Sequence, residues 1–447
     1  MKKKLVYAAA VGIFSSIALM GCSSSETAST TAATAAQTTA GGTSAAASSE
    51  ADTTAAEDLS EVQPASEITF WSTKEDCFSE LCAEFEAETG IKVNATYMGG
   101  YDDMVNKVMA GIAGENLPNV AQLGQRHGLA QMYDSGWLLS VEDYISEDIL
   151  EDILPGFWKR FTYKDTKVIL PFQNSMPMLY YNKTLFDENG IEIPTTLDEV
   201  AATAQEIKDK TGIYGVTLNS DYPWYFMALM YNSGTAPLVD GQPSMNTEAV
   251  KNICQKIQQL AVMDQTMPAN QHATAQEDFC NGNIGMLMTS CASYATIQNL
   301  VGDKFEVGIA MFPEVTTMDI TMGGNGLGMF KSTPEEEKAA TMFIEFMLDP
   351  QRIAEGSLNS GYVAVTNAAT ETETYQTYLE DPNRQVVDEQ LQYLGGAAVT
   401  PVDSLVWNEV MDLIDSLEAD PEINIDERLA EIDTAIADYM SEYAGNE

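Results

Sequence analysis

Aromatic and polar side chains stand at the ends of several predicted strands. Trp71 closes a strand predicted over 67–73, Trp224 follows another strand, and Ser290 closes a third. Aromatic rings stack on the C–H faces of sugars, and hydroxyls, amides and carboxylates hydrogen-bond the sugar hydroxyls. Because ligand clefts of α/β proteins form at strand ends, this pattern favours binding of a hydroxyl-rich small molecule. Core packing is the simpler interpretation of each ring.

Residues that commonly carry catalysis or hold metals are scarce. The only histidines are His127 and His272, and there is no GxSxG, HExxH or nucleotide-binding loop. No CxxC pair indicates zinc, and the adjacent Tyr180 and Tyr181 would face opposite sides of a strand. We therefore expect no enzyme, no cofactor and no metal. A glycosidase needs only two carboxylates, so the 67 acidic residues leave that alternative open.

The elements that would position these side chains alternate between strand and helix. A first run comprises strands over 67–73, 91–98 and 119–124 with helices over 75–89 and 101–113. Gly90 is placed to end the first of these helices. The alternation restarts later, and its strands and helices are predicted over 168–172, 178–182, 197–210, 213–218, 247–263, 284–290, 305–311, 327–330, 334–348, 403–417 and 426–443. Such alternation predicts parallel α/β sheets, and the length suits two domains.

The first 22 residues have the order of a secretory signal. Three lysines at 2–4 precede an apolar stretch over 5–17, and small residues then lead to Cys22. The sequence Leu-Met-Gly-Cys at 19–22 resembles a bacterial lipoprotein signal, which implies that Cys22 becomes the first mature residue and carries lipid. An ordinary secretory signal that happens to contain a cysteine is the alternative. No later stretch is long and apolar enough for a membrane span.

Residues 23–64 are nearly all Ser, Thr, Ala and Gly with a few acids. Such a segment buries too little apolar surface to repay the entropy of ordering, so it is predicted to be a flexible tether. A glycosylated stalk is the alternative and would also be a spacer.

The formal net charge of −45 excludes nucleic acid as a partner, because phosphate binding needs a basic surface. Five cysteines remain after Cys22, an odd number with no disulfide-rich pattern, and we expect most of them to be buried thiols.

Short motifs along the chain occur in the order found in a known family. They lie at 68–71, 85–93, 101–120, 170–172, 179–183, 278–288, 323–324 and 350–366. Together they resemble extracellular solute-binding proteins of the carbohydrate-transporter kind, in particular the sugar and glycerol-phosphate branch. Each motif is weak alone, and it is their order that is specific.

The resemblance implies a type II periplasmic-binding-protein-like α/β fold with two lobes joined by a hinge. Each lobe would be a mainly parallel sheet flanked by helices. Residues 65–172 and 316–361 would form one lobe, and residues 173–315 and 362–447 the other. The ligand would lie in the cleft between the lobes and close them, and the membrane permease would recognise the closed form.

In this family the protein would be a lipid-anchored receptor of an ABC importer at the extracellular face of the cytoplasmic membrane. We expect a monomer whose partners are a small carbohydrate and the transmembrane subunits of the permease, and which meets the membrane only through its lipid. Alternative cargoes are glycerol phosphate, a metal or a peptide, and a surface adhesin is a further alternative.

Several positions match ligand contacts of the family or lie beside them. The candidate binding residues are Trp71, Glu75, Tyr101, Gln125, Ser175, Trp224, Ser290, Tyr294, Gly324, Tyr362 and Trp407. Gln125 stands where the glycerol-phosphate branch has a glutamate, and the segment 391–401 lacks the arginine with which that branch holds phosphate. Because a desolvated phosphate without a cation is costly, we expect a neutral sugar or oligosaccharide.

Overall fold

The computed structural model describes residues 59–124, 128–396 and 398–445. Contacts divide the chain into residues 1–54 and residues 55–447. Everything below concerns the described part of the second unit. The predicted signal, Cys22 and nearly all of the predicted tether lie outside the described residues, as does Gln125. Among the described residues, no helix is long and apolar enough to cross a membrane.

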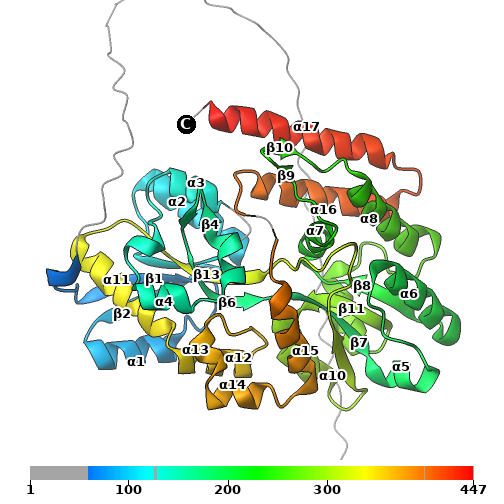
Figure 1. Ribbon diagram of the computed structural model, residues 1–447, viewed down its shortest axis with the longest axis horizontal. Coiled ribbons are helices and arrows are strands. Elements are labelled where there is room, and N and C mark those ends of the chain that lie inside the picture. The colour runs from blue at the N-terminus through cyan, green and yellow to red at the C-terminus, as the bar shows by residue number, and fades with distance from the viewer. Residues whose placement is uncertain (1–58, 125–127, 397, 446–447) are drawn as a thin grey trace, which may run out of the picture. The chain divides into compact units, whose positions relative to one another are not determined.

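The first of two main sheets has the strand order β2-β1-β3-β13-β6. These strands are β1 (Glu67–Ser72), β2 (Lys92–Tyr97), β3 (Val120–Gly124), β6 (Leu170–Ser175) and β13 (Gly323–Met329). β1 runs parallel to β2 and β3, whereas β13 runs antiparallel to β3 and β6. Phe343 of α11 (Pro334–Met347) packs its ring 5.4 Å from that of Phe70 on β1 and 5.2 Å from that of Phe85 on α1 (Ser79–Thr89). These ring contacts join the two helices, and Figure 1 shows α1 and α11 beside β1 and β2.

The second main sheet has the order β12-β7-β11-β8. Its strands are β7 (Pro177–Asn182), β8 (Tyr214–Leu218), β11 (Ile284–Ser290) and β12 (Val307–Ala310). β7 runs antiparallel to β11 and β12, and β8 runs parallel to β11. The helices that pack on these strands are α5 (Lys183–Asn189), α6 (Leu197–Thr211), α9 (Ala275–Cys280) and α15 (Pro382–Gln390).

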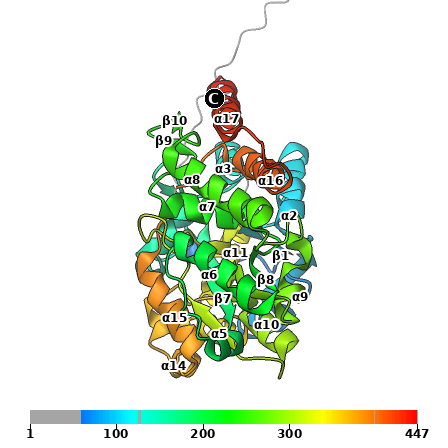
Figure 2. The same cartoon turned by 90° about the vertical axis from the view of Figure 1, so that its right-hand side faces the viewer.

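The C-terminal helices α16 (Asp403–Ala419) and α17 (Ile425–Ala444) pack against α7 (Tyr222–Asn232) and α8 (Glu248–Gln258) (Figure 2). The remaining helices are α2 (Tyr101–Gly114), α3 (Leu129–Asp134), α4 (Glu147–Asp152), α10 (Tyr294–Val301), α12 (Pro350–Asn359), α13 (Asn367–Thr370) and α14 (Glu373–Tyr378). Two short hairpins pair β4 (Thr162–Tyr163) with β5 (Thr166–Lys167) and β9 (Leu238–Val239) with β10 (Gln242–Pro243).

Local sequence explains where several helices start and stop. Thr196 and Thr333 each form a capping box with the glutamate three residues on, which satisfies the free N–H groups of the first turn. Gly90 adopts the left-handed conformation that ends α1, as its position predicted. α1 itself begins at Ser79 rather than at Glu75, because Cys77 and Phe78 have φ of 51° and cannot belong to a right-handed helix.

The two-lobed α/β fold agrees with the expectation, but the sheets are mixed and not mainly parallel. Met176 alone separates β6 from β7, so the chain leaves one sheet and enters the other without a crossover helix. β7 then pairs antiparallel with β11 and β12. The lobe boundary expected after Phe172 falls inside β6, which continues to Ser175. β13 also begins at Gly323, four residues before the strand predicted over 327–330.

Helix α7 is absent from the sequence-based prediction. Ten of its residues, from Pro223 to Asn232, are buried. A helix that is apolar on every side lacks the alternation of polar and apolar positions that marks an amphipathic helix. This omission matters because the first turn of α7 reaches the candidate site.

Candidate functional site

A cavity of about 300 Å³ lies between elements of the two sheets. The first lobe supplies Tyr101 at the start of α2, Ser175 at the end of β6 and Gly323–Gly324 at the start of β13. Tyr362 lines the cavity from the segment after α12. The second lobe supplies the other residues: Asp221, Trp224, Gln276, Ser290, Ala292, Ser293 and Thr296. This position, between two lobes and at strand ends, is typical of ligand sites in α/β proteins.

Glycines shape the wall formed by the first lobe. Gly324 has φ of +90°, and a Cβ there would lie 2.0 Å from the Gln173 carbonyl oxygen. Both conformation and space therefore require glycine. A Cβ on Gly323 would lie 2.6 Å from Cζ2 of Trp224, so this glycine leaves room for the indole. Beside them Asn325 donates its Nδ2 to the Tyr101 hydroxyl at 2.9 Å and fixes that ring.

The wall formed by the second lobe carries Trp224 in the first turn of α7. Its side chain is 6 % exposed, and its ring centroid lies 5.1 Å from that of Tyr225. Its Nε1–H finds no hydrogen-bond partner among the described residues. Ser290 accepts a hydrogen bond from the Ala292 backbone N–H at 3.2 Å, and its hydroxyl proton remains available to donate.

Two buried polar atoms of the first sheet also lack partners within the described chain. They are Oδ1 of Asn174 on β6 and Oδ1 of Asn325 on β13, both on side chains that are at most 1 % exposed. Buried polar groups are nearly always hydrogen-bonded. Of these atoms, Trp224 Nε1 belongs to a residue that lines the cavity, so this donor is the one that a ligand there could reach. Hydroxyl groups can accept a hydrogen bond from it.

The charge at the cavity is low. Among the described residues that line it there is no Lys, Arg or His, and Asp221 is the one carboxylate. The neighbouring Tyr101, burial and a hydrogen bond with Tyr101 raise the pKa of Tyr362 well above its ordinary value. The described residues of 391–401 do not line the cavity.

Six of the predicted binding residues meet at this cavity: Tyr101, Ser175, Trp224, Ser290, Gly324 and Tyr362. Tyr294 does not reach it, because its hydroxyl donates to Asp381 at 2.6 Å and ties α10 to the start of α15. Trp407 is 9 % exposed within the core cluster and also lies apart from the cavity. Trp71 is half-buried on β1, and Glu75 is exposed in the turn after it; neither lines the cavity.

Sequence reasoning missed other lining residues, among them Gly323, Asp221 and Gln276. The first two are adjacent or close to predicted site residues, so proximity in sequence could have indicated them. Gln276 is one polar residue on a helix, and no pattern distinguishes it from a solvated one.

Comparison with protein families gives one match that spans most of the fold. The model of the bacterial extracellular solute-binding proteins matches residues 80–384. The chain belongs to this family. The resemblance inferred from the short motifs is thereby confirmed.

Individual relatives agree with this assignment. The sn-glycerol-3-phosphate-binding periplasmic protein UgpB of Escherichia coli is 24% identical over 363 residues, which cover 74% of this chain and 82% of the relative. The solved UgpB of Mycobacterium tuberculosis in complex with glycerophosphocholine has a TM-score of 0.75 at 19% identity, over 85% of this chain and 99% of that one. An ABC substrate-binding protein of Listeria monocytogenes in complex with cycloalternan has a TM-score of 0.73 at 22% identity, over 84% and 99%. Identities this low show a shared fold.

Proposed function

We propose that this solute-binding protein captures a neutral sugar or oligosaccharide in the cavity between its lobes and delivers it to the permease of an ABC importer. The observation that carries the proposal is the character of the cavity. Its described walls combine aromatic rings, hydroxyls and an unpaired Trp224 Nε1–H, and they include no cationic side chain.

The known ligands of the relatives fall into two chemical classes. Solved relatives form complexes with cycloalternan, acarbose and maltotriose, which are saccharides or a saccharide analogue, and also with glycerophosphocholine. Arginine and lysine are the side chains that bind phosphate most strongly. Since the described lining residues of this chain offer none, we favour the saccharide class.

Ligand binding without turnover follows from the same proposal, and incubation with the bound glycan should return it uncleaved.

We further propose that Cys22 carries lipid and holds the receptor at the extracellular face of the membrane. Mass spectrometry of the N-terminal peptide from protein isolated from membranes tests this: an unmodified mature N-terminus would contradict it.

A thermal-shift screen against neutral sugars, sn-glycerol 3-phosphate and glycerophosphocholine tests the cargo. We expect a rise in Tm with at least one neutral saccharide, because a ligand that binds only the folded form stabilises it. A response to the phosphorylated compounds alone would overturn the neutral cargo. No response to any sugar, with a response to a peptide or metal, would overturn sugar binding altogether.

Two matched tryptophan variants localise the binding. Trp224→Leu should weaken the affinity for the responding sugar about tenfold or more, since it removes both a stacking surface and a donor. Trp158→Leu is the control, because Trp158 does not line the cavity and instead packs under the Lys167 ammonium, which lies 4.7 Å from its ring. Equal affinities in both variants would place the ligand elsewhere.

A further inference from the structure

Asn325 on β13 adjoins the candidate cavity without lining it. Its side chain is buried, and its Nδ2 donates to the hydroxyl of Tyr101, which does line the cavity. Asn325 can therefore influence a bound ligand through Tyr101.

The backbone places Asn325 and Tyr101 together. Asn325 pairs with Gly124 of β3. A Cβ on Gly124 would lie 2.9 Å from Cδ1 of Tyr101, so the missing side chain leaves room for the ring against the end of β3. On its other edge, β13 shifts its register with β6 between Asn325 and Gly326, as at a β-bulge. Bulges beside functional sites commonly re-aim a side chain. A glycine and a register shift thus accompany the contact between the amide and the hydroxyl.

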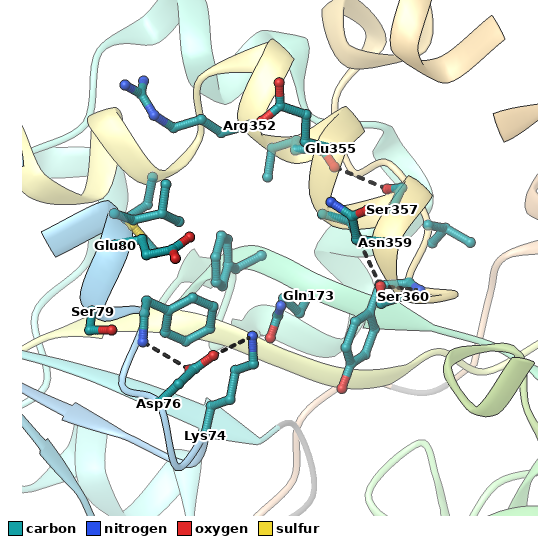
Figure 3. Close-up of a pocket in the computed structure, with 18 residues that line it drawn as sticks. Lys74, Asp76, Ser79, Glu80, Gln173, Arg352, Glu355, Ser357, Asn359 and Ser360 are labelled. Carbon is teal, nitrogen blue, oxygen red and sulfur yellow. Dashed lines mark hydrogen bonds and ion pairs between the residues drawn. The ribbon is translucent and has the colours of Figure 1, made fainter. Parts of the chain in front are cut away.

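The neighbour of Asn325 on β6 is Gln173, which is engaged elsewhere. Gln173 Oε1 accepts a hydrogen bond from Gln122 Nε2 at 3.2 Å. The Gln173 side chain lines a different cavity, of about 430 Å³, between α1, β6 and α12 (Figure 3). Among the described residues, the Asn325 amide group bonds Tyr101, and its Oδ1 has no partner.

The direction of this hydrogen bond distinguishes Tyr101 from other tyrosines. Several tyrosine hydroxyls elsewhere donate to a carboxylate, as in the pairs Tyr294–Asp381 and Tyr375–Asp388, each at 2.6 Å. A carboxylate only accepts, so it binds the phenolic proton. At Tyr101 the partner is an amide N–H, which only donates, so the Tyr101 oxygen accepts and its proton is directed elsewhere.

Tyr362 is the next member of this chain of hydrogen bonds. It lines the cavity and shares a hydrogen bond with Tyr101. Two hydroxyls use one proton in the bond that joins them, and the other proton can be donated to a third group. Because Asn325 donates to Tyr101, the pair presents an O–H donor on the cavity side. A hydroxyl or ring oxygen of a sugar can accept from that donor.

We propose that Asn325 is a positioning residue that directs the hydroxyls of Tyr101 and Tyr362 to donate to an acceptor oxygen of the ligand. This inference rests on the proposed function and adds a hydrogen-bond polarity to it: at this wall the protein donates and the saccharide accepts. Asn325 acts on the saccharide only through Tyr101.

Two substitutions separate the direction of the hydrogen bond from the space that the Asn325 side chain fills. Asn325→Leu has a similar shape and makes no hydrogen bond, and it should weaken saccharide binding about fivefold. Asn325→Asp places an ionised acceptor there at about pH 8. Tyr101 should then donate to it, as Tyr294 does to Asp381, and binding should weaken about tenfold or more. Asn325→Ala replaces the leucine variant if that one does not fold.

Calorimetry measures the affinity for one neutral saccharide, the one that raises Tm most among glucose, galactose, mannose, xylose, maltose and cellobiose. Each Asn325 variant is also combined with Tyr101→Phe, which has no hydroxyl to direct. In that background, Asn325→Leu and Asn325→Asp should change the affinity by less than about twofold, because the residue through which they act is already altered.

Asn119→Leu is the matched control. Asn119 is a buried asparagine just before β3, at the opposite end of that strand from Gly124. Its Oδ1 accepts from the Thr69 N–H at 2.8 Å, and it does not line the cavity. Asn119→Leu should lower Tm and leave the affinity unchanged.

Two outcomes would overturn the inference while leaving the proposed function intact. One is an Asn325→Asp variant that binds the saccharide as tightly as the wild-type protein at about pH 8. The other is that the losses from Asn325→Leu and Tyr101→Phe multiply in the double variant, which would show that Asn325 does not act through Tyr101. Absence of binding by every saccharide in the wild-type protein would instead overturn the proposed function, and the inference with it.

Discussion

Helix α7 contributes to two polar regions, which differ in whether their buried polar atoms have hydrogen-bond partners. At its first residue, Tyr222 stacks on His272 with ring centroids 4.1 Å apart. The two imidazole nitrogens face the Leu218 carbonyl oxygen and Glu418 Oε1, each at 3.0 Å, and the Asn270 N–H donates to the other Glu418 oxygen at 2.6 Å. Every polar atom of this cluster has a partner. Two residues further along α7, Trp224 Nε1 has none within the described chain.

We take this difference to separate a structural cluster from the proposed binding site. A buried polar group without a partner is costly, and the cost is tolerated where function needs it. The His272 cluster joins the end of β8 to α16, and its buried polar atoms are paired within the protein. In the wall around Trp224 the indole N–H is left over as a donor. We therefore expect changes in the first region to alter stability and changes in the second to alter ligand affinity.

The largest effect should follow from Glu418→Ala, which removes one partner of a buried pair. Loss of one member of such a pair costs about 3–5 kcal/mol, because the other member is left uncompensated. Urea unfolding should show a decrease of this size in the free energy of unfolding. Glu422→Ala, at an exposed position shortly after α16, should show almost none. The comparison would break if Glu418→Ala weakened ligand binding under fully folding conditions while the free energy of unfolding stayed unchanged.

A smaller effect on the free energy of unfolding should appear when the pH is changed. Burial alone lowers the pKa of His272, but the hydrogen bond and charge of Glu418, the Leu218 carbonyl and the charge of Asp415 outweigh it, so the pKa is raised from its ordinary value of 6.5. Since the folded state holds the proton more tightly, this stabilisation is complete below the unfolded pKa and is lost as pH rises through the folded pKa. Every tenfold gain in proton affinity on folding adds about 1.4 kcal/mol to the stability of the protonated protein.

The measurement is the difference in the free energy of unfolding between the wild-type protein and His272→Gln, whose side chain does not titrate. Ionisable groups that do not interact with His272 cancel in this difference. We expect the wild-type advantage to be larger at about pH 6 than at about pH 8.5. A difference that stays constant or grows with pH would show that the imidazole is not held in its charged form.

Sequence patterns predicted the parts of this fold that depend on local chemistry. The strand ending at Ser72, the stop at Gly90 and the amphipathic helix after Thr196 all follow from alternation, left-handed caps and capping boxes. Pairing direction was not predictable in this way. β7 pairs antiparallel with β11, a strand far away in the sequence, and periodicity does not encode such a pairing.

The residues of the candidate site were likewise only partly predictable from the sequence. Trp224 and Trp407 are both tryptophans near helix starts, yet only Trp224 lines the cavity, because the rotation of each helix is set by tertiary packing. Tyr294 follows Ser290 closely, but its hydroxyl turns to Asp381. Glu80 and Asn359 line the same cavity, which lies between α1, β6 and α12. They are far apart in the sequence, and no spacing pattern connects them.

The smallest effect isolates the unpaired donor itself. Trp224→Phe keeps an aromatic ring at the cavity and removes the Nε1–H. The smaller ring leaves a cavity at this buried position, which should cost about 1–2 kcal/mol of stability. One lost hydrogen bond of about 1 kcal/mol should weaken sugar binding about fivefold. Trp158→Phe, which removes an indole N–H remote from the cavity, should leave the affinity unchanged.

Calorimetry and urea unfolding of both variants would sharpen the comparison. If Trp224→Phe lost several kcal/mol of stability and no affinity, the indole N–H would serve the fold, and the distinction drawn along α7 would fail. If the variant lost affinity and little stability, the indole N–H of Trp224 would be a hydrogen-bond donor to the ligand. The His272 cluster, already complete, should show the opposite behaviour in the same two measurements.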